Sequence, residues 1–325
     1  MGAYPAVTEW LLEEDQPSVR YLALTELAGR SENAAEVRAT RARIARRGWA
    51  ADQLASLGPK GYWERREPRT VAQWIDFLYR PSFTATFWRA LLLADLGLDR
   101  RDPRIARIAE RIFDFKLQLS SPFNFFHEEA CMAGNTARML TRFGFSSDRR
   151  VRKLFDWLIE DQREDGGWNC AQGTPGTLDV WEPLSAFASV PKPERSPAMD
   201  RAIERGVAFY LERKLMEEGR RYPPWGRFHF PTYFFYDVLV GLDLVTRLGG
   251  AHDRRLRPAL ELLRDRRRPD GTWAMGPTHP DLGRGVTMHP DPSKVRPLML
   301  EAPGAPSKWI TLTALRVLER VGSAD

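Results

Sequence analysis

Apolar residues recur at three- and four-residue spacing along most of the chain, and no segment shows a sustained alternation of apolar and polar positions. The first pattern is typical of helices that pack through one face, whereas the second would indicate strands. Glycine follows several apolar stripes, as at Gly97, Gly144 and Gly249, and a short turn containing aspartate comes next. Glycine suits the left-handed residue that ends a helix, and aspartate suits the cap that begins one. The pattern predicts an all-α chain of helical hairpins.

The predicted helices are of two kinds. One kind is apolar around most of its circumference, as buried helices are, and the other has one charged face, as outer helices have. The apolar helices begin near Ser18, Ser82, Ala130, Thr177, Thr232 and Ser307. The charged helices cover residues 32–46, 103–118, 148–161, 198–215 and 253–267, with 5–14 or 70–79 as a sixth. This alternation predicts an (α/α)6 toroid; the alternative is an open HEAT-like solenoid, which residues 17–24 would suit.

A Gly-x-Trp segment occurs three times, at residues 61–63, 166–168 and 271–273, with 105 residues between successive copies. A hairpin turn falls midway, so the repeating unit is a two-helix hairpin of about half that length. We therefore predict one toroid domain over residues 1–325, with divergent helices over 1–80 and the clearest repeats over 81–325. The long loop at 276–306 is rich in proline and glycine, and we interpret it as a lid over the mouth of the ring or as a surface excursion.

Residues 162–168 read Gln-Arg-Glu-Asp-Gly-Gly-Trp, and residues 267–273 repeat the pattern with arginine at the glutamine position. Both segments resemble the QW motifs of the terpenoid cyclase and protein prenyltransferase superfamily, the prenyltransferase and squalene oxidase repeat. The resemblance covers residues 82–321 and implies an (α/α)6 toroid around a largely apolar cavity. The Asp-x-Asp-Asp acid of class II cyclases and the Asp-Asp-x-x-Asp magnesium motif of class I synthases do not occur in this sequence. The resemblance therefore extends to the scaffold and stops short of the known catalytic signatures.

Composition narrows the class of protein. With 43% hydrophobic and 11% aromatic residues the chain is not intrinsically disordered. The formal net charge of +6 comes mostly from arginines that alternate with acids along helices, which indicates solvated outer faces rather than a nucleic-acid interface. Two cysteines, the absence of a signal-peptide pattern and the absence of an 18-residue apolar stretch predict a cytoplasmic protein without a transmembrane segment. Peripheral contact with a membrane and the oligomeric state stay open.

In a toroid the N-termini of the inner helices converge on one mouth of the cavity, where they favour polar and anionic ligands. Three acids near those ends are candidate catalytic residues: Asp237, Glu128 and Asp179. Asp237 lies in an apolar stretch, where burial would raise a carboxyl pKa, and we expect it to give or take a proton. For each acid, helix capping or a structural bond is the alternative.

Aromatic residues near the same ends are candidate substrate-binding residues: Phe87, Trp181, Tyr233, Tyr236 and Trp309. In chemistry of the terpenoid kind, their faces would stabilise carbocations by cation–π attraction. Packing in the core is the alternative for each ring.

Four residues form a candidate zinc set: His127, Cys131, Cys170 and His229. His127 and Cys131 are four residues apart, which places both on one helical face, and zinc accepts two thiolates and two imidazoles. Because no pair has the short Cys-x2-Cys spacing, buried unligated thiols are the alternative.

Three functions remain open from the sequence. The leading hypothesis is a terpenoid cyclase-like toroid that acts by acid–base chemistry on an isoprenoid or other hydrophobic small molecule in its central cavity. The alternative is a non-catalytic helical-repeat protein that binds a lipid-like ligand or a partner protein. The second alternative is a zinc-dependent, prenyltransferase-like enzyme. The sequence specifies neither substrate nor reaction.

Overall fold

The computed structural model describes residues 5–64, 69, 83–116, 129–171, 173–217, 222–277 and 298–322. Within these ranges the chain is helical, and its only β-type pairings are two isolated bridges. The all-α class predicted from apolar periodicity is therefore confirmed. No helix in the same ranges is long and apolar enough to cross a membrane.

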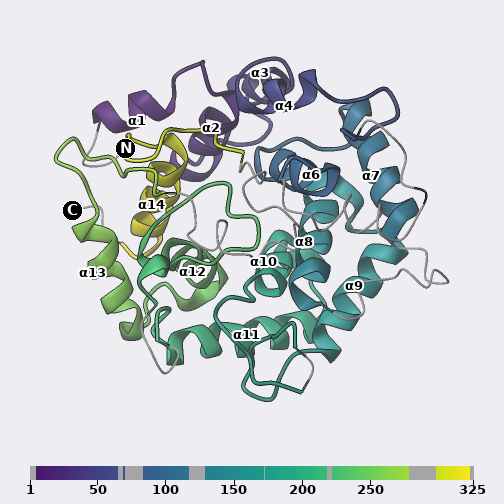
Figure 1. Ribbon diagram of the computed structural model, residues 1–325. Coiled ribbons are helices and arrows are strands. Elements are labelled where there is room, and N and C mark those ends of the chain that lie inside the picture. Colours follow the sequence, from purple (N-terminus) through teal and green to yellow (C-terminus); the bar gives the residue numbers. More distant parts are fainter. Residues whose placement is uncertain are drawn as a thin grey trace.

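The helices alternate between an inner and an outer layer of a ring (Figure 1). The inner layer contains α2 (Pro17–Leu22), α6 (Thr86–Asp95), α8 (Ala130–Leu140), α10 (Glu182–Ser189), α12 (Val238–Val245) and α14 (Lys308–Arg320). The outer layer contains α1 (Pro5–Leu11), α3 (Ala35–Ile44), α7 (Pro103–Lys116), α9 (Arg149–Glu160), α11 (Pro197–Glu212) and α13 (Arg257–Asp265), with α4 (Trp49–Ala55) beside α3. The division into one domain and the number of hairpins stay predictions, and the candidate outer segment 70–79 lies outside the described residues.

Most predicted boundaries are close to the observed ones. The inner helix α8 begins at Ala130, as predicted, and α14 begins directly after its capping residue Ser307, whose hydroxyl accepts from the Ile310 amide at 3.0 Å. The predicted helix ends at Gly97, Gly144 and Gly249 are also confirmed, since each has a positive φ. Two inner helices, α10 and α12, begin five and six residues later than predicted, because loop residues form the turns before them.

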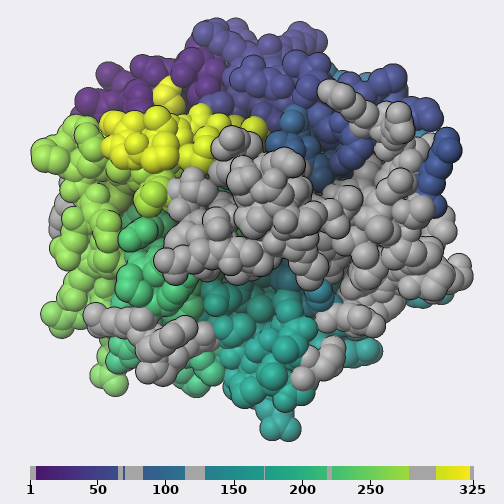
Figure 2. Space-filling model, in the orientation of Figure 1, coloured from purple at the N-terminus to yellow at the C-terminus, as the bar shows by residue number. Residues whose placement is uncertain are grey.

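The two ends of the described chain meet and close the ring. Helix α14 packs against α1 and α2. At its first residue, the Lys308 ammonium lies 2.7 Å from a Glu13 carboxylate oxygen and 2.6 Å from one of Asp15. In the space-filling view the C-terminal residues, in yellow, lie directly against the N-terminal ones, in purple (Figure 2). This closure favours the toroid over the open solenoid.

The three Gly-x-Trp segments adopt the same turn. The indole nitrogens of Trp63, Trp168 and Trp273 each donate to the carbonyl ten residues earlier, at 3.0, 2.8 and 2.8 Å. The glycine that begins each segment has a φ of +84°, +88° and +83°, respectively. Each turn thus ties its own outer element to the start of the next inner segment, and this is why the tryptophans recur at constant spacing.

Gly166 offers a test of this turn. A Cβ atom at this position would lie 2.5 Å from the Arg205 carbonyl oxygen, and the φ of +88° is unfavourable for any other residue. We expect Gly166→Ala to lower the free energy of unfolding by about 2–3 kcal/mol, from backbone strain together with the clash. Gly173→Ala is the matched control, because Gly173 has a φ of +70° and nothing within 4 Å. Urea unfolding of both variants measures the difference; equal losses would contradict the close approach at Gly166.

Candidate functional site

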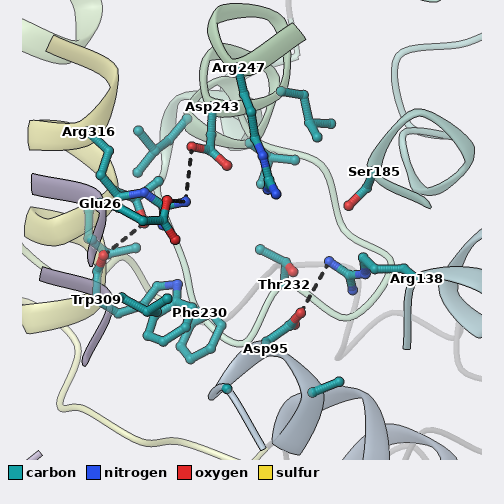
Figure 3. A pocket seen from close by; sticks show the side chains of 18 of the residues that line it. Glu26, Asp95, Arg138, Ser185, Phe230, Thr232, Asp243, Arg247, Trp309 and Arg316 are labelled. Atoms are coloured by element: carbon teal, nitrogen blue, oxygen red, sulfur yellow. Dashed lines mark hydrogen bonds and ion pairs between the residues drawn. The ribbon is translucent and has the colours of Figure 1, made fainter. Parts of the chain in front are cut away.

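The ring surrounds a half-open cavity of about 250 Å³, lined by side chains from every inner helix (Figure 3). Its charged lining residues are five arginines and four acids: Arg41, Arg138, Arg142, Arg247, Arg316, Glu26, Asp95, Asp237 and Asp243. Apolar and aromatic residues complete the lining, among them Leu22, Trp181, Phe230, Leu239, Leu244 and Trp309. The cavity is therefore much more polar than the largely apolar one that the resemblance implies.

Most of the charged groups project from the C-terminal ends of the inner helices or just beyond them. Asp95 is the last residue of α6, Arg138 lies in the last turn of α8, and Arg247 follows α12 in the irregular helical segment Thr246–Gly250. Arginines at these ends face the negative pole of the helix dipole, which favours them. We refer to Glu26, Asp95, Arg138, Arg142, Asp243, Arg247 and Arg316 as the charged belt.

Asp243 is the central acid of the belt. Its Oδ1 accepts from the Arg320 guanidinium at 2.8 Å and lies 3.9 Å from that of Arg316, which also pairs with Glu26. Burial alone would raise the pKa of the Asp243 carboxyl, but Arg316, Arg320 and Arg247 together hold it well below its usual range. The negative charge of Asp243 therefore balances the positive charges of these arginines.

Arg247 differs from the other three arginines of the charged belt, each of which pairs with an acid. It extends into the open space of the cavity (Figure 3), and none of the described residues accepts a hydrogen bond from it or pairs with it within 4 Å. The side chain is exposed to the open part of the cavity, although protein surrounds it; this surrounding protein lowers its pKa to about 10, Asp243 acts in the opposite direction, and the guanidinium stays charged at neutral pH. A guanidinium presents a planar fork of donors that matches phosphate and carboxylate groups.

Arg138 is a second cationic side chain at the cavity, and it is almost fully buried, with 3% of its surface exposed. Its guanidinium lies 4.9 Å from the centre of the Trp181 ring, donates to Asn135 Oδ1 at 3.0 Å and lies 3.6 Å from Asp95. Its Nε has no hydrogen-bond partner among the described residues. The cavity therefore has donor capacity left in addition to that of Arg247.

A histidine–aspartate pair lies at the N-terminal end of α12. His229 Nδ1 donates to Asp237 Oδ2 at 2.8 Å, and the His229 backbone amide donates to the same oxygen at 3.0 Å. Asp237 Oδ1 accepts from the Val240 amide at 2.9 Å and so caps the helix. Both side chains are buried, and both line the cavity. The carboxylate holds the imidazole in one orientation, in which the second ring nitrogen, Nε2, is buried.

The arrangement changes the role expected for Asp237. The sequence predicts that it gives or takes a proton, and its two oxygens accept three hydrogen bonds, two of them from His229. The geometry therefore also places Asp237 to orient His229, while proton transfer by Asp237 stays a prediction. No three His, Cys, Asp or Glu side chains gather as a metal site in the described ranges, so His229 does not join the two thiols of the candidate zinc set there.

The other predicted acids and ligands are placed as follows. Asp179 does not line the cavity; its Oδ1 accepts from the Trp225 indole at 2.9 Å, which is a structural role. Glu128 and His127 lie outside the described residues, so their roles stay predictions. Cys131 and Cys170 do lie together, with 2.9 Å between the sulfur atoms.

The five predicted aromatic residues divide into two groups. Trp181 and Trp309 line the cavity, and Trp309 stacks on Phe230 with 3.8 Å between ring centroids. Phe87, Tyr233 and Tyr236 do not line it. Phe87 packs edge-on against Trp88, Tyr233 stacks on Phe83 at 4.1 Å, and the Tyr236 hydroxyl donates to the Leu215 carbonyl at 2.8 Å. These three rings belong to the core between helices.

Sequence reasoning missed the charged belt. Its members stand out in the sequence as single charges within apolar stretches of inner helices, for example Asp95 in Leu-Leu-Leu-Ala-Asp-Leu and Asp243 in Val-Gly-Leu-Asp-Leu-Val. A charge on a helix that is otherwise apolar has to meet a partner or a cavity, because an isolated buried charge is costly. These single charges therefore indicate the site from the sequence. They lie at the C-terminal ends of the inner helices, whereas the candidate residues were predicted at the N-terminal ends.

No protein-family model and no curated protein sequence matches this chain. Among solved structures, it is similar to the type II terpene cyclase MstE from Scytonema without ligand, at 17% identity over 96% of this chain and 88% of that chain, with a TM-score of 0.43. It is also similar to a variant of the same enzyme in complex with its substrate geranylgeranyl dihydroxybenzoate, at 16% identity over 96% and 87%, with a TM-score of 0.43. The ligand of this cavity therefore has to be inferred from its own side chains.

Proposed function

We propose that this protein is a toroid enzyme of the terpenoid cyclase-like kind, which binds a small isoprenoid or comparable hydrophobic compound with an anionic group. The anionic group is held by the charged belt, and the hydrophobic part contacts Phe230, Trp309 and Trp181. The His229–Asp237 pair then moves a proton. Arg247 carries the proposal, because it is a charged donor that lies exposed in a half-open cavity without a hydrogen-bond or ion-pair partner among the described residues.

The two ends of the cavity differ in polarity, which favours an amphiphilic ligand. Phe230 and Trp309 lie near the N-terminal ends of α12 and α14, whereas Arg247 and Arg316 lie near the C-terminal ends of the same two helices. Pockets for small molecules combine such apolar walls with a few placed polar groups, and their volumes run from about 300 Å³ upward. At about 250 Å³ this cavity lies just below that range, so a short isoprenoid suits it.

The experiment is a comparison of ligand affinities by calorimetry. Geranyl diphosphate, geraniol and inorganic pyrophosphate are the probes. We expect Arg247→Gln to weaken binding of the two anionic probes about ten- to hundredfold, which is the contribution of one charge-assisted hydrogen bond. Geraniol, which has no charge, should bind the variant and the wild type alike. Because Arg247 makes no hydrogen bond or ion pair within 4 Å with the described residues and only its longer-range attraction to Asp243 is lost, thermal stability should change little.

Arg255→Gln is the matched control, since Arg255 is exposed on the outer layer and pairs with Asp253 at 2.7 Å. Its affinity for all three probes should equal that of the wild type. Failure of the wild type to bind either anionic probe would contradict an anion site in the cavity. Product analysis of the geranyl diphosphate mixture separates the two leading functions: a changed carbon skeleton indicates an enzyme, whereas recovery of unchanged ligand indicates the non-catalytic binding protein.

A further inference from the structure

The cysteines form a contact that the proposed function does not use. Cys131 lies in the first turn of α8, and Cys170 lies in the loop that follows the Trp168 turn. Their sulfur atoms are 2.9 Å apart, which is closer than unbonded sulfurs normally approach, although a disulfide would need about 2.05 Å. Both residues are free thiols and only partly buried. The fold therefore brings together two thiols that are 39 residues apart in the sequence.

The surroundings of the two thiols are acidic and buried. Glu129 Oε2 lies 4.0 Å from the Cys131 sulfur. Glu182, the first residue of α10, is fully buried, and neither carboxylate oxygen has a hydrogen-bond partner among the described residues. Burial, and then the charge of Cys170, raises the pKa of the Glu182 carboxyl well above its usual value. Glu182 therefore favours the neutral carboxyl more strongly than an exposed glutamate does.

The contact itself supplies what thiol oxidation needs. When one thiolate attacks an oxidant, a second thiol within reach resolves the product, and each of these sulfurs has the other 2.9 Å away.

A bound zinc is the alternative explanation for the contact. Zinc in a protein site needs three or four ligands; the described residues bring no third His, Cys, Asp or Glu into a site with this pair, and the candidate ligand His127 lies outside them.

We propose that Cys131 and Cys170 are a redox-active dithiol, which a hydroperoxide closes to a disulfide between the start of α8 and the loop after Trp168. The thiolate of one cysteine attacks a peroxide oxygen; the O–O bond breaks, and a cysteine sulfenic acid and hydroxide form. The thiol of the other cysteine then attacks the sulfenic sulfur, the S–S bond forms, and water leaves, while the hydroxide takes up the proton released when the first thiol ionised. In total two thiols and one hydrogen peroxide give one disulfide and two waters, so the thiols are oxidised and the peroxide is reduced.

The disulfide would connect two elements next to the cavity. Helix α8 carries Arg138 two turns beyond Cys131, and Gly134 between them packs on the α10 backbone so closely that a Cβ would lie 2.5 Å from the Glu182 carbonyl carbon. A covalent link at the start of α8 therefore restrains the wall that presents Arg138. We expect the oxidised protein to have a midpoint of thermal unfolding higher by about 5 °C, because the link closes a loop in the unfolded chain.

The experiment treats the full chain with hydrogen peroxide and counts thiols after denaturation. Two thiols should be titrated before treatment and none after it, the intact mass should fall by two hydrogen atoms, and a reductant should restore both thiols. In Cys131→Ser and in Cys170→Ser, the remaining cysteine should stop at sulfenic acid, which dimedone traps, because no second thiol is left to resolve it.

Three outcomes would overturn the proposal. The first is that both thiols survive a treatment that oxidises free cysteine in the same solution. The second is a disulfide that joins two copies of the chain. The third is stoichiometric zinc in the reduced protein that is lost in both serine variants, which would identify the pair as metal ligands. Peptide mapping and metal analysis of the same sample distinguish these outcomes, and none of them depends on ligand binding in the cavity.

Discussion

Asp237→Asn is expected to lower turnover about 10²–10⁴-fold while leaving the protein folded, because proton transfer by a positioned side chain contributes this much. The carboxylate lies 2.8 Å from His229 Nδ1 and stabilises the positive charge that the imidazole gains when Nε2 takes a proton. An asparagine keeps the size of the side chain but removes that charge. The amide also has one oxygen where the carboxylate has two, so it must give up either the Val240 amide or the imidazole. Product formation from the isoprenoid that binds the wild type measures the effect.

The loss of the helix cap has to be separated from the loss of the proton-transfer pair. Removing a cap costs about 1 kcal/mol of stability, and Asp148→Asn is the matched control. Asp148 caps α9 by accepting from the Arg150 amide at 2.8 Å, and it lies outside the cavity lining. We expect this control to retain full turnover. Nitrogen-15 spectra of His229 report the state of the imidazole in Asp237→Asn without a substrate. Full turnover in a folded Asp237→Asn protein would exclude the pair from the chemistry.

Asp243→Asn is expected to lower the free energy of unfolding by about 3 kcal/mol. Arg316, Arg320 and Arg247 all depend on this carboxylate for charge balance, and removing one partner of a buried ion pair costs about 3–5 kcal/mol because the other charge stays behind. The belt has only one further acid near these arginines, Glu26, which already pairs with Arg316. Urea unfolding at neutral pH measures the difference. Asp253→Asn is the control, since Asp253 pairs with Arg255 on the surface and should cost at most about 1 kcal/mol.

The pH dependence gives an independent check on Asp243. Its pKa in the folded protein lies below the usual value, so its contribution to stability is fully present above pH about 4, where the carboxyl of the unfolded chain is also ionised. That contribution is lost as the pH falls toward the folded pKa. The gap in stability between wild type and Asp243→Asn should therefore be constant from pH 5 to 8 and become smaller below pH 4. A gap that grows in acid would contradict the charge pairing.

Local patterns in the sequence determined the helices and their order. Apolar spacing predicted the inner and outer layers, and the glycines at 97, 144 and 249 ended helices as expected because their left-handed backbone is favourable for glycine alone. The recurrence of Gly-x-Trp predicted a repeated turn, and each indole makes the same bond ten residues back. These features depend on residues close together in the chain, so the sequence carries them directly.

The site depended on contacts that only the closed ring creates. Asp243 meets Arg316 from 73 positions further on because α12 packs against α14, and Cys131 meets Cys170 because the loop after Trp168 lies against the start of α8. Nothing in their local sequence states how each helix is rotated, and rotation decides whether a ring such as Tyr236 packs in the core or, like Trp309, faces the cavity. The sequence by itself thus determined the all-α architecture and candidates such as Asp237 and His229. The tertiary structure decided that the cavity is charged and that Arg247 stands in it without a partner among the described residues, since packing across the ring sets both.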